Sequence, residues 1–208
     1  ADRRRLDVVR ARRADAARAY FEEIAPVWDE ERSLHADAAT VEAAVVDALD
    51  DRPLGRVLDL GTGTGRMIQL LAERAEHCVG LDSSHSMLAV ARANLERAGV
   101  EDWELRQGDA YSPPFEAATF DLVVIHQVLH YLDDPGRAVA EAARLLAPGG
   151  RLLVVDFAPH THEFLRSAAH RRLGFGHDQL RDWFDHVGFD CRAVADIEPS
   201  SADRAADA

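Results

Sequence analysis

The stretch from Val57 to Gly65, which reads V-L-D-L-G-T-G-T-G, decides the fold of this chain. Its first four residues form an apolar strand pattern that contains one acid, Asp59. The glycines that follow at alternate positions allow the backbone to turn sharply and to approach a ligand without a Cβ in the way. A helix pattern begins at once with Met67. Because loop N–H groups and a helix N-terminus hold polar or anionic groups, the stretch predicts a strand, a ligand-binding loop and a helix.

The glycine spacing and a second acid narrow the class of ligand. The spacing is G-x-G-x-G, whereas a pyrophosphate-binding dinucleotide loop reads G-x-G-x-x-G, and position 66 is occupied by Arg66. Downstream, residues 77–82 read as a strand that ends in Asp82, followed by Ser83 and Ser84 as helix caps. A carboxylate at such a strand end can accept hydrogen bonds from both hydroxyls of a ribose. Together the two patterns predict a ligand that contains a nucleoside, with or without phosphates.

Five ordered motifs across residues 56–156 resemble the class I S-adenosylmethionine (SAM) methyltransferases. Beyond the first two motifs, residues 107–110 are similar to the loop that receives the adenine, and residues 119–124 are similar to the fourth strand. Residues 145–156 are similar to the turn into the fifth strand. The resemblance implies an α/β fold with a Rossmann-like, doubly wound sheet and with N-terminal helices over the cofactor site. It also implies methyl transfer from SAM, which leaves S-adenosylhomocysteine (SAH).

The same resemblance assigns the residues that would bind the cofactor. Backbone groups of the glycine loop would hold the amino-acid tail, while Asp59 would orient the loop and face the ligand's ammonium. Asp82 would bind the ribose and Met87 would pack on the adenine, whose edge would meet Asp109 and the N–H of Ala110. Plainer interpretations stay open: Asp59 as a strand-end cap, Met87 as helix core, and residues 109–110 as a surface turn. The expected cofactor set is Asp59, Gly61, Thr62, Gly63, Gly65, Asp82, Ser83, Met87, Asp109, Ala110 and His126.

Methyl transfer is an in-line displacement at carbon, away from a sulfonium that is already activated. Catalysis can therefore consist largely of holding the acceptor in position and excluding water, and a base is needed only where the acceptor must lose a proton. Residues 126–131 follow the fourth strand, where the family builds the floor of the acceptor pocket. If this segment is helical, His126 and His130 share one face, and either could be the base. His126 could instead form only a wall beside the methionine tail.

Histidines after the fifth strand raise a metal site as an alternative. His160 and His162 could join His126 or His130 as ligands. No carboxylate or cysteine stands in a familiar ligand spacing with them, so the sequence predicts no metal site.

The N-terminal segment, residues 1–36, is expected to be helical, with a helix over residues 2–24 that ends before Pro26. Seven arginines lie within residues 1–18, either on a solvated helix face or on a helix that docks to another domain. In small-molecule members of the family, helices before the first strand cover the active site. The residues expected to form this lid, or to pin the segment to the core through their aromatic rings, are Tyr20, Phe21, Trp28, Arg32 and His35.

The SAM-binding domain is expected over residues 37–195, followed by a polar tail over residues 196–208. The domain would open with a helix over residues 37–50 and would end with a sixth strand over residues 189–195. Strands and helices alternate in between, which predicts right-handed crossovers and a parallel sheet. Ligands of such sheets bind at the carboxyl ends of the strands.

The composition indicates a cytoplasmic protein. A net charge of −13 disfavours direct binding of nucleic acid, and no apolar run approaches the length of a membrane span. The two cysteines, Cys78 and Cys191, fall in predicted strands and are expected to be free, buried thiols, which fits a reducing compartment.

Two functions of different classes stay open. Residues 126–132 (H-Q-V-L-H-Y-L) are similar to small-molecule methyltransferases, including those of ubiquinone and menaquinone biosynthesis, so the first is an enzyme that methylates a small molecule. Residues 20–35 also resemble the methyltransferase domain that follows a winged-helix domain in some ArsR-type repressors. The second function is therefore a sensory domain that binds SAM or SAH and reports to a fused or associated winged-helix DNA-binding domain. A homodimer is compatible with either function, and the loop spacing disfavours a nicotinamide oxidoreductase.

Overall fold

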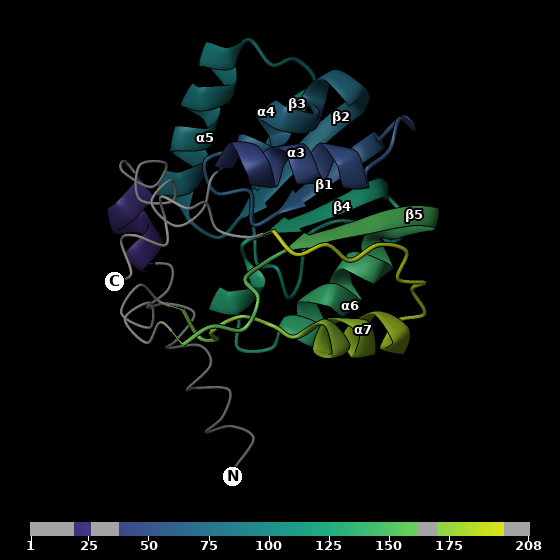
Figure 1. Ribbon diagram of the computed structural model, residues 1–208. Coiled ribbons are helices and arrows are strands. Elements are labelled where there is room, and N and C mark those ends of the chain that lie inside the picture. The colour runs from purple at the N-terminus through teal and green to yellow at the C-terminus, as the bar shows by residue number, and fades with distance from the viewer. Residues whose placement is uncertain (1–18, 26–37, 162–169, 198–208) are drawn as a thin grey trace.

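The computed structural model of the protein describes residues 19–25, 38–161 and 170–197. At its centre is a five-stranded sheet in the order β3-β2-β1-β4-β5, in which every neighbouring pair is parallel (Figure 1). The strands are β1 Gly55–Leu60, β2 Ala75–Asp82, β3 Trp103–Gln107, β4 Phe120–His126 and β5 Leu146–Val155. The α/β, Rossmann-like fold predicted from the sequence is thus confirmed.

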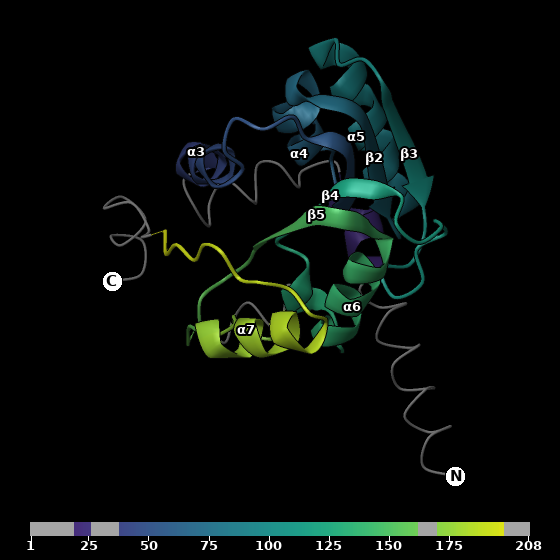
Figure 2. The same cartoon turned by 90° about the vertical axis from the view of Figure 1, so that its right-hand side faces the viewer.

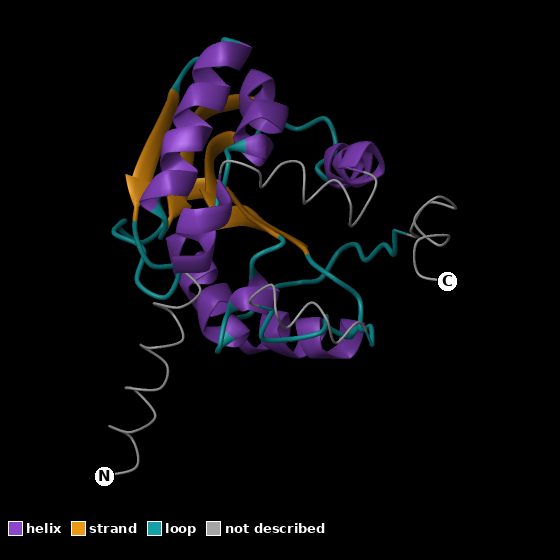
Figure 3. Cartoon of the chain, turned by 90° about the vertical axis from the view of Figure 1, so that its left-hand side faces the viewer, coloured by secondary structure: helices purple, strands orange, loops and turns teal. Residues whose placement is uncertain are grey.

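Helices cover both faces of the sheet (Figures 2 and 3). The helices α3, α4 and α5 pack on one face, and α6 and α7 pack on the other. Their bounds are α3 Ala38–Ala48, α4 Arg66–Leu71, α5 His85–Ala98, α6 Pro135–Leu145 and α7 His177–His186. Two 3-10 helices, η2 Ala72–Arg74 and η3 Leu129–Tyr131, lie between them in the chain, and a further helix runs over residues 19–24.

Two buried clusters, one on each face of the sheet, hold the layers together. Successive strand residues point to opposite faces, so Val57 packs with the residues of α3 and α4, whereas its neighbour Leu58 packs with those of α6. The same alternation occurs in β4, where Leu122 and Val124 join the first cluster and Val123 joins the second. Parallel strands that are covered on both faces read as continuous apolar runs, which is the pattern of these two strands.

The functional end of the sheet follows from the strand order. The order reverses between β1 and β4, and ligands of open α/β sheets bind at the carboxyl ends of the strands beside such a reversal. Asp59 and Asp82 lie at the carboxyl ends of β1 and β2. The helix α5 follows Asp82 in the chain. At its start, the hydroxyl of Ser84 accepts a hydrogen bond from the N–H of Met87 at 3.2 Å. Ser84 is therefore the helix cap that the sequence predicts.

The sixth strand expected over residues 189–195 does not form. The segment follows α7 as a coil (Figure 1) and is not part of the five-stranded sheet. Pairing would bury little apolar surface, because Val194 and Ile197 are 46% and 36% exposed and charged residues such as Arg192 stand among them. An extended segment that lacks a buried face is not stable as a strand.

Both cysteines are free, as predicted, but only Cys78 lies in a strand. It is buried in β2, and this burial raises the pKa of its thiol to about 12, so the thiol stays protonated at neutral pH. Cys191 is half-buried in the segment after α7. The expectation that Cys191 is buried in a strand is therefore wrong.

The two helices expected before the first strand are described in part. Residues 19–24 are helical, which agrees with a helix that ends before Pro26, and residues 2–18 lie outside the described residues. The helix expected over residues 37–50 is observed as α3. No helix within the described ranges combines the length and the apolar character that a membrane span needs.

We expect Leu58→Ala to lower the free energy of unfolding by about 2–5 kcal/mol, because the fully buried side chain leaves a cavity between β1 and α6. Urea unfolding followed by circular dichroism measures the change. The control is Val194→Ala, whose 46% exposed side chain should change the free energy of unfolding by less than about 0.5 kcal/mol. Equal losses of unfolding free energy in the two variants would contradict the assignment of Leu58 to the core.

Candidate functional site

The glycine loop is fastened to the end of β2. The N–H groups of Gly61 and Thr62 donate hydrogen bonds to the carbonyl oxygen of Leu81, at 2.8 and 2.9 Å. Gly61 has a φ of 86°, and a Cβ at this position would lie 2.4 Å from Cγ2 of Val128. Only glycine fits such a turn. The loop therefore lies against both the end of β2 and the segment that follows β4.

Asp59 holds the loop from inside the sheet. The residue is 2% exposed, and its Oδ2 accepts a hydrogen bond from the hydroxyl of Thr62 at 2.7 Å. The carbonyl of Thr62 accepts a hydrogen bond from the N–H of Gly65 at 2.9 Å, and α4 begins directly afterwards. The acid of β1 is thus connected through one threonine to the start of the following helix.

Asp82 joins the loop, β2 and α5 through one carboxylate. Its Oδ2 accepts a hydrogen bond from the N–H of Gly63, and its Oδ1 accepts one from the N–H of Ser84, both at 2.9 Å. Burial raises the pKa of Asp82 against the effect of these hydrogen bonds, and the nearby carboxylate of Glu22 adds to the increase. A carboxylate has about four acceptor sites, so the two backbone bonds leave capacity for further donors.

Ser83 and the residues expected around the adenine, which are Met87, Asp109 and Ala110, follow β2 and β3. Ser83 is exposed, while Met87 is buried against the N-terminal segment of residues 19–25. Asp109 is exposed, and its Oδ1 accepts a hydrogen bond from the N–H of Tyr111 at 2.9 Å. Aspartate side chains commonly form such a turn with their own backbone. Ala110 is half-buried beside this turn.

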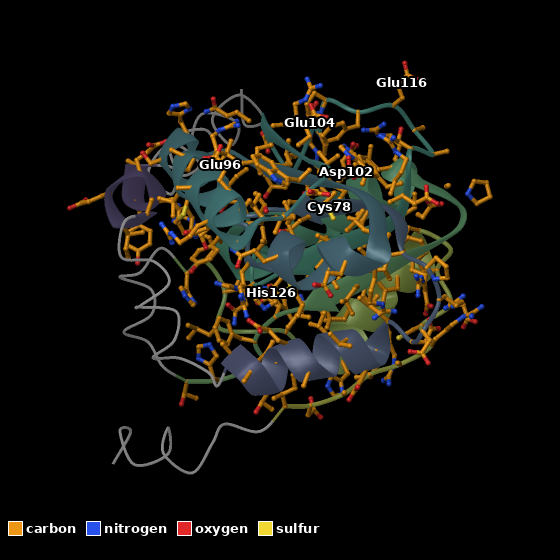
Figure 4. The ribbon with its side chains drawn as sticks, turned by 90° about the horizontal axis from the view of Figure 1, so that it is seen from above. Cys78, Glu96, Asp102, Glu104, Glu116 and His126 are labelled. Carbon is orange, nitrogen blue, oxygen red and sulfur yellow. The ribbon has the colours of Figure 1, made fainter. Side chains whose placement is uncertain are left out.

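The segment after β4 does not form the helix that would place His126 and His130 on one face. His126 is the last residue of β4, and Gln127, with a φ of 55°, donates a hydrogen bond to the carbonyl of the last residue of β5 at 2.7 Å. The 3-10 helix η3 starts only at Leu129, so His126 and His130 do not share a helical face. His126 is half-buried, and Figure 4 labels it in the view from above.

His130 is held by Asp156, the residue directly after β5. The Nδ1 atom of His130 lies 2.7 Å from Oδ1 of Asp156, and both side chains are 1% exposed. Because a carboxylate only accepts hydrogen bonds, Nδ1 carries the hydrogen. The same carboxylate also accepts hydrogen bonds from the N–H groups of Leu129 and Phe157, at 2.9 and 2.8 Å. The side chain of His130 is therefore buried and engaged, and it is not presented to solvent.

Backbone hydrogen bonds connect the segment of residues 170–175 to His130. The N–H groups of Arg171 and Arg172 both donate hydrogen bonds to the carbonyl of His130, at 2.8 and 3.1 Å. Neither this segment nor Asp156 belongs to the site residues predicted from the sequence. The sequence does contain a pattern that indicates Asp156. It is an acid directly after the apolar strand β5, just as Asp82 is the acid at the end of β2.

Aromatic rings gather at the carboxyl ends of β4 and β5. We call them the ring cluster, and its members are Phe21, His130, Tyr131, Phe157 and His170. The ring centroids lie 4.9 Å apart for Phe21 and Tyr131, and 4.2 Å apart for His130 and His170. Burial raises the pKa of the Tyr131 phenol, so its hydroxyl stays protonated at neutral pH.

The remaining predicted site residues are placed in part. Tyr20 contacts Phe21, with ring centroids 5.4 Å apart, and His160 contacts Phe157 at 5.8 Å. Within the described ranges, no three histidines, cysteines or acids lie close enough together to hold a metal ion. The positions outside the described residues are Trp28, Arg32, His35 and His162.

Comparison with known proteins matches the central part of the chain to one family. Residues 58–154 match the family model described as a methyltransferase domain. A demethylmenaquinone methyltransferase of Thermus thermophilus is 42% identical over 144 residues, which cover 67% of this chain and 64% of that protein. A 2-phytyl-1,4-naphtoquinone methyltransferase of Thermosynechococcus vestitus is 36% identical over 146 residues, with the same two coverages. The match therefore spans less than two thirds of the length of these curated relatives.

Solved structures agree with the sequence matches. A candidate methyltransferase from Bacillus halodurans superposes with a TM-score of 0.67 and 29% identity, covering 73% of this chain and 70% of that one. The sheet order, the glycine loop between β1 and α4, and the acid that ends β2 all lie within the matched region. Residues 58–154 thus match a methyltransferase domain in sequence, and they share the Rossmann-like fold of that solved structure.

Proposed function

We propose that the protein is an enzyme that transfers a methyl group from SAM to a small aromatic acceptor of the quinol class. The observation that carries this proposal is the carboxylate of Asp82, which is fixed against the glycine loop by the N–H of Gly63 at 2.9 Å. The acceptor class is supported by the names of the two relatives, which act on a demethylmenaquinone and on a phytylated naphthoquinone. The products would be SAH, a methylated ring and the proton that the methyl group replaces.

The polar groups around the loop fit SAM better than a dinucleotide. Asp82 keeps acceptor capacity for two ribose hydroxyls beside its two backbone bonds. The cation that follows the loop, Arg66, donates two hydrogen bonds to the carboxylate of Glu42, both at 2.6 Å, and is thereby engaged with an acid of α3. SAM carries no phosphate that would need such a cation, and its ammonium would lie near Asp59.

When bound, SAM supplies a methyl group on a positively charged sulfur, which is a good leaving group. The residues of the chain would then act by orienting SAM and the acceptor. Asp59 and Thr62 hold the loop against the amino-acid tail, Asp82 holds the sugar, and His126 borders the tail from the end of β4. Reactants that are fixed at attack distance gain much of their rate from this orientation alone.

The ring cluster supports a planar acceptor. Aromatic rings attract one another in offset or edge-to-face arrangements at centroid distances of about 4.5–7 Å. The protonated hydroxyl of Tyr131 can donate a hydrogen bond to a ring oxygen of the acceptor. If the acceptor must lose a proton, His126 is the half-buried histidine that can take it, whereas His130 is engaged by Asp156.

The finer expectations about partners stay predictions from the sequence. These are a fused or associated winged-helix domain, a sensory role in place of catalysis, and a homodimer. The relatives named above are methyltransferases, which favours turnover over sensing.

We expect Asp82→Asn to weaken the binding of SAH by about 1.5–3 kcal/mol, because charge-assisted hydrogen bonds to the ribose are lost. Isothermal titration calorimetry measures the dissociation constant. The control is Asp182→Asn, since this acid is exposed on α7. An unchanged affinity in Asp82→Asn would contradict the ribose assignment.

The affinity for SAH should fall as the pH is lowered. Only the ionised Asp82 accepts two ribose hydroxyls, and its raised pKa means that it takes up a proton at a higher pH than an ordinary aspartate does. Calorimetric titrations at a series of pH values should show that the loss of affinity begins at a higher pH than the one at which ordinary aspartates take up a proton. In Asp82→Asn this part of the pH dependence should disappear, and its persistence there would assign it to another group.

Methyl transfer from labelled SAM should occur with naphthoquinols and not with amines of similar size. The measurement follows label in products extracted from parallel reactions with both acceptor classes. Turnover restricted to amines would contradict the acceptor class. Tight binding of SAH without turnover of any acceptor would contradict the enzyme and favour the sensory domain.

A further inference from the structure

The carboxylate of Glu22, from the N-terminal segment of residues 19–25, lies on the first turn of α5. Its Oε1 accepts hydrogen bonds from the N–H of His85 at 2.8 Å and from the hydroxyl of Ser84 at 3.2 Å. Its Oε2 accepts hydrogen bonds from the N–H of Ser86 at 3.2 Å and from the hydroxyl of the same serine. One side chain thus connects two segments that are more than sixty residues apart in the sequence.

These contacts complete the N-terminus of α5. The first N–H groups of a helix have no partner within the helix, and the helix dipole favours a negative charge beside them. Ser84 accepts a hydrogen bond from the N–H of Met87, while Glu22 takes those of His85 and Ser86. The hydrogen bond from the Ser86 side chain contributes most to lowering the pKa of Glu22, so its carboxylate is charged at neutral pH.

The same short segment reaches both halves of the candidate site. On the cofactor side, Ser84, which contacts Glu22, donates its N–H to Asp82 at 2.9 Å. On the acceptor side, Phe21 packs edge-on against Tyr131 of the ring cluster, with centroids 4.9 Å apart. Figure 1 shows the helix of residues 19–24, in purple, on the side to which the arrows of β4 and β5 point.

We propose that Glu22 is a positioning residue that couples cofactor binding to the placement of the segment over the acceptor side. A ligand held by Asp82 stabilises the first turn of α5 through Ser84, and this turn holds Glu22 and, with it, Phe21. Such coupling is reciprocal, so the docked segment also favours the ligand. The inference rests on the proposed binding of SAM and SAH at Asp82.

Hydrogen–deuterium exchange with and without SAH tests the coupling. The variant is Glu22→Gln, which keeps the shape of the side chain and its tendency to form a helix. The control is Glu23→Gln, because Glu23 is the exposed neighbour on the same helix. In the wild type and the control, SAH should slow exchange in residues 19–25 and in the first turn of α5. In Glu22→Gln the slowing in residues 19–25 should be lost, and its retention would overturn the proposal.

Two further readouts separate coupling from a general loss of structure. Calorimetry should show that SAH binds about threefold to tenfold more weakly to Glu22→Gln than to Glu23→Gln at neutral pH, since a charge-assisted contact is lost. The pH at which SAH binding declines should move lower in Glu22→Gln, because the like charge that helps to raise the pKa of Asp82 is gone. Equal affinities and equal pH profiles in the two variants would overturn the proposal. Absence of SAH binding to the wild type would instead refute the proposed function itself.

Discussion

The carboxylate of Asp82 connects three parts of the chain that are separate in the sequence. It ends β2, accepts a hydrogen bond from the glycine loop through Gly63, and accepts another from the start of α5 through Ser84. A half-buried carboxylate gains from hydrogen bonds that satisfy its oxygens, and these two bonds fix the loop and the helix relative to each other. Other groups act on the same two elements, because Asp59 and Thr62 contact the loop and Glu22 contacts the helix.

The carboxylate of Asp156 connects the segments that follow β4 and β5 in a comparable way. Asp156 follows β5 and accepts hydrogen bonds from His130 and from two backbone N–H groups, which fixes the turn after β4. Asp82 thus fixes the segments that would hold the nucleoside, and Asp156 fixes the segments that carry the ring cluster. Residues 19–25 contact both regions, through Glu22 at the start of α5 and through Phe21 at Tyr131. The ring cluster lies outside the sheet, on residues 19–25 and on the segments that follow β4 and β5.

Much of the fold could be predicted because its signals are local. The apolar runs of β1 and β2, the glycines of the loop and the capping serine at position 84 each act within a few residues. Features that depend on distant partners were missed or mistaken. Residues 189–195 have the apolar alternation of a strand but gain no buried face, and His126 and His130 have helical spacing but are separated by a turn that pairs with the end of β5. Glu22 carries no recognisable pattern at all, because its role exists only when α5 lies beside it.

The central claim is that Asp82 holds the sugar of a sulfonium nucleoside above the glycine loop. A crystal structure of the protein with SAH tests it most directly. The account predicts both ribose hydroxyls within hydrogen-bonding distance of the Asp82 carboxylate, with the amino-acid tail over Gly61 and Gly63. Clear density for SAH at another place, with the carboxylate of Asp82 turned away from any ligand, would contradict it.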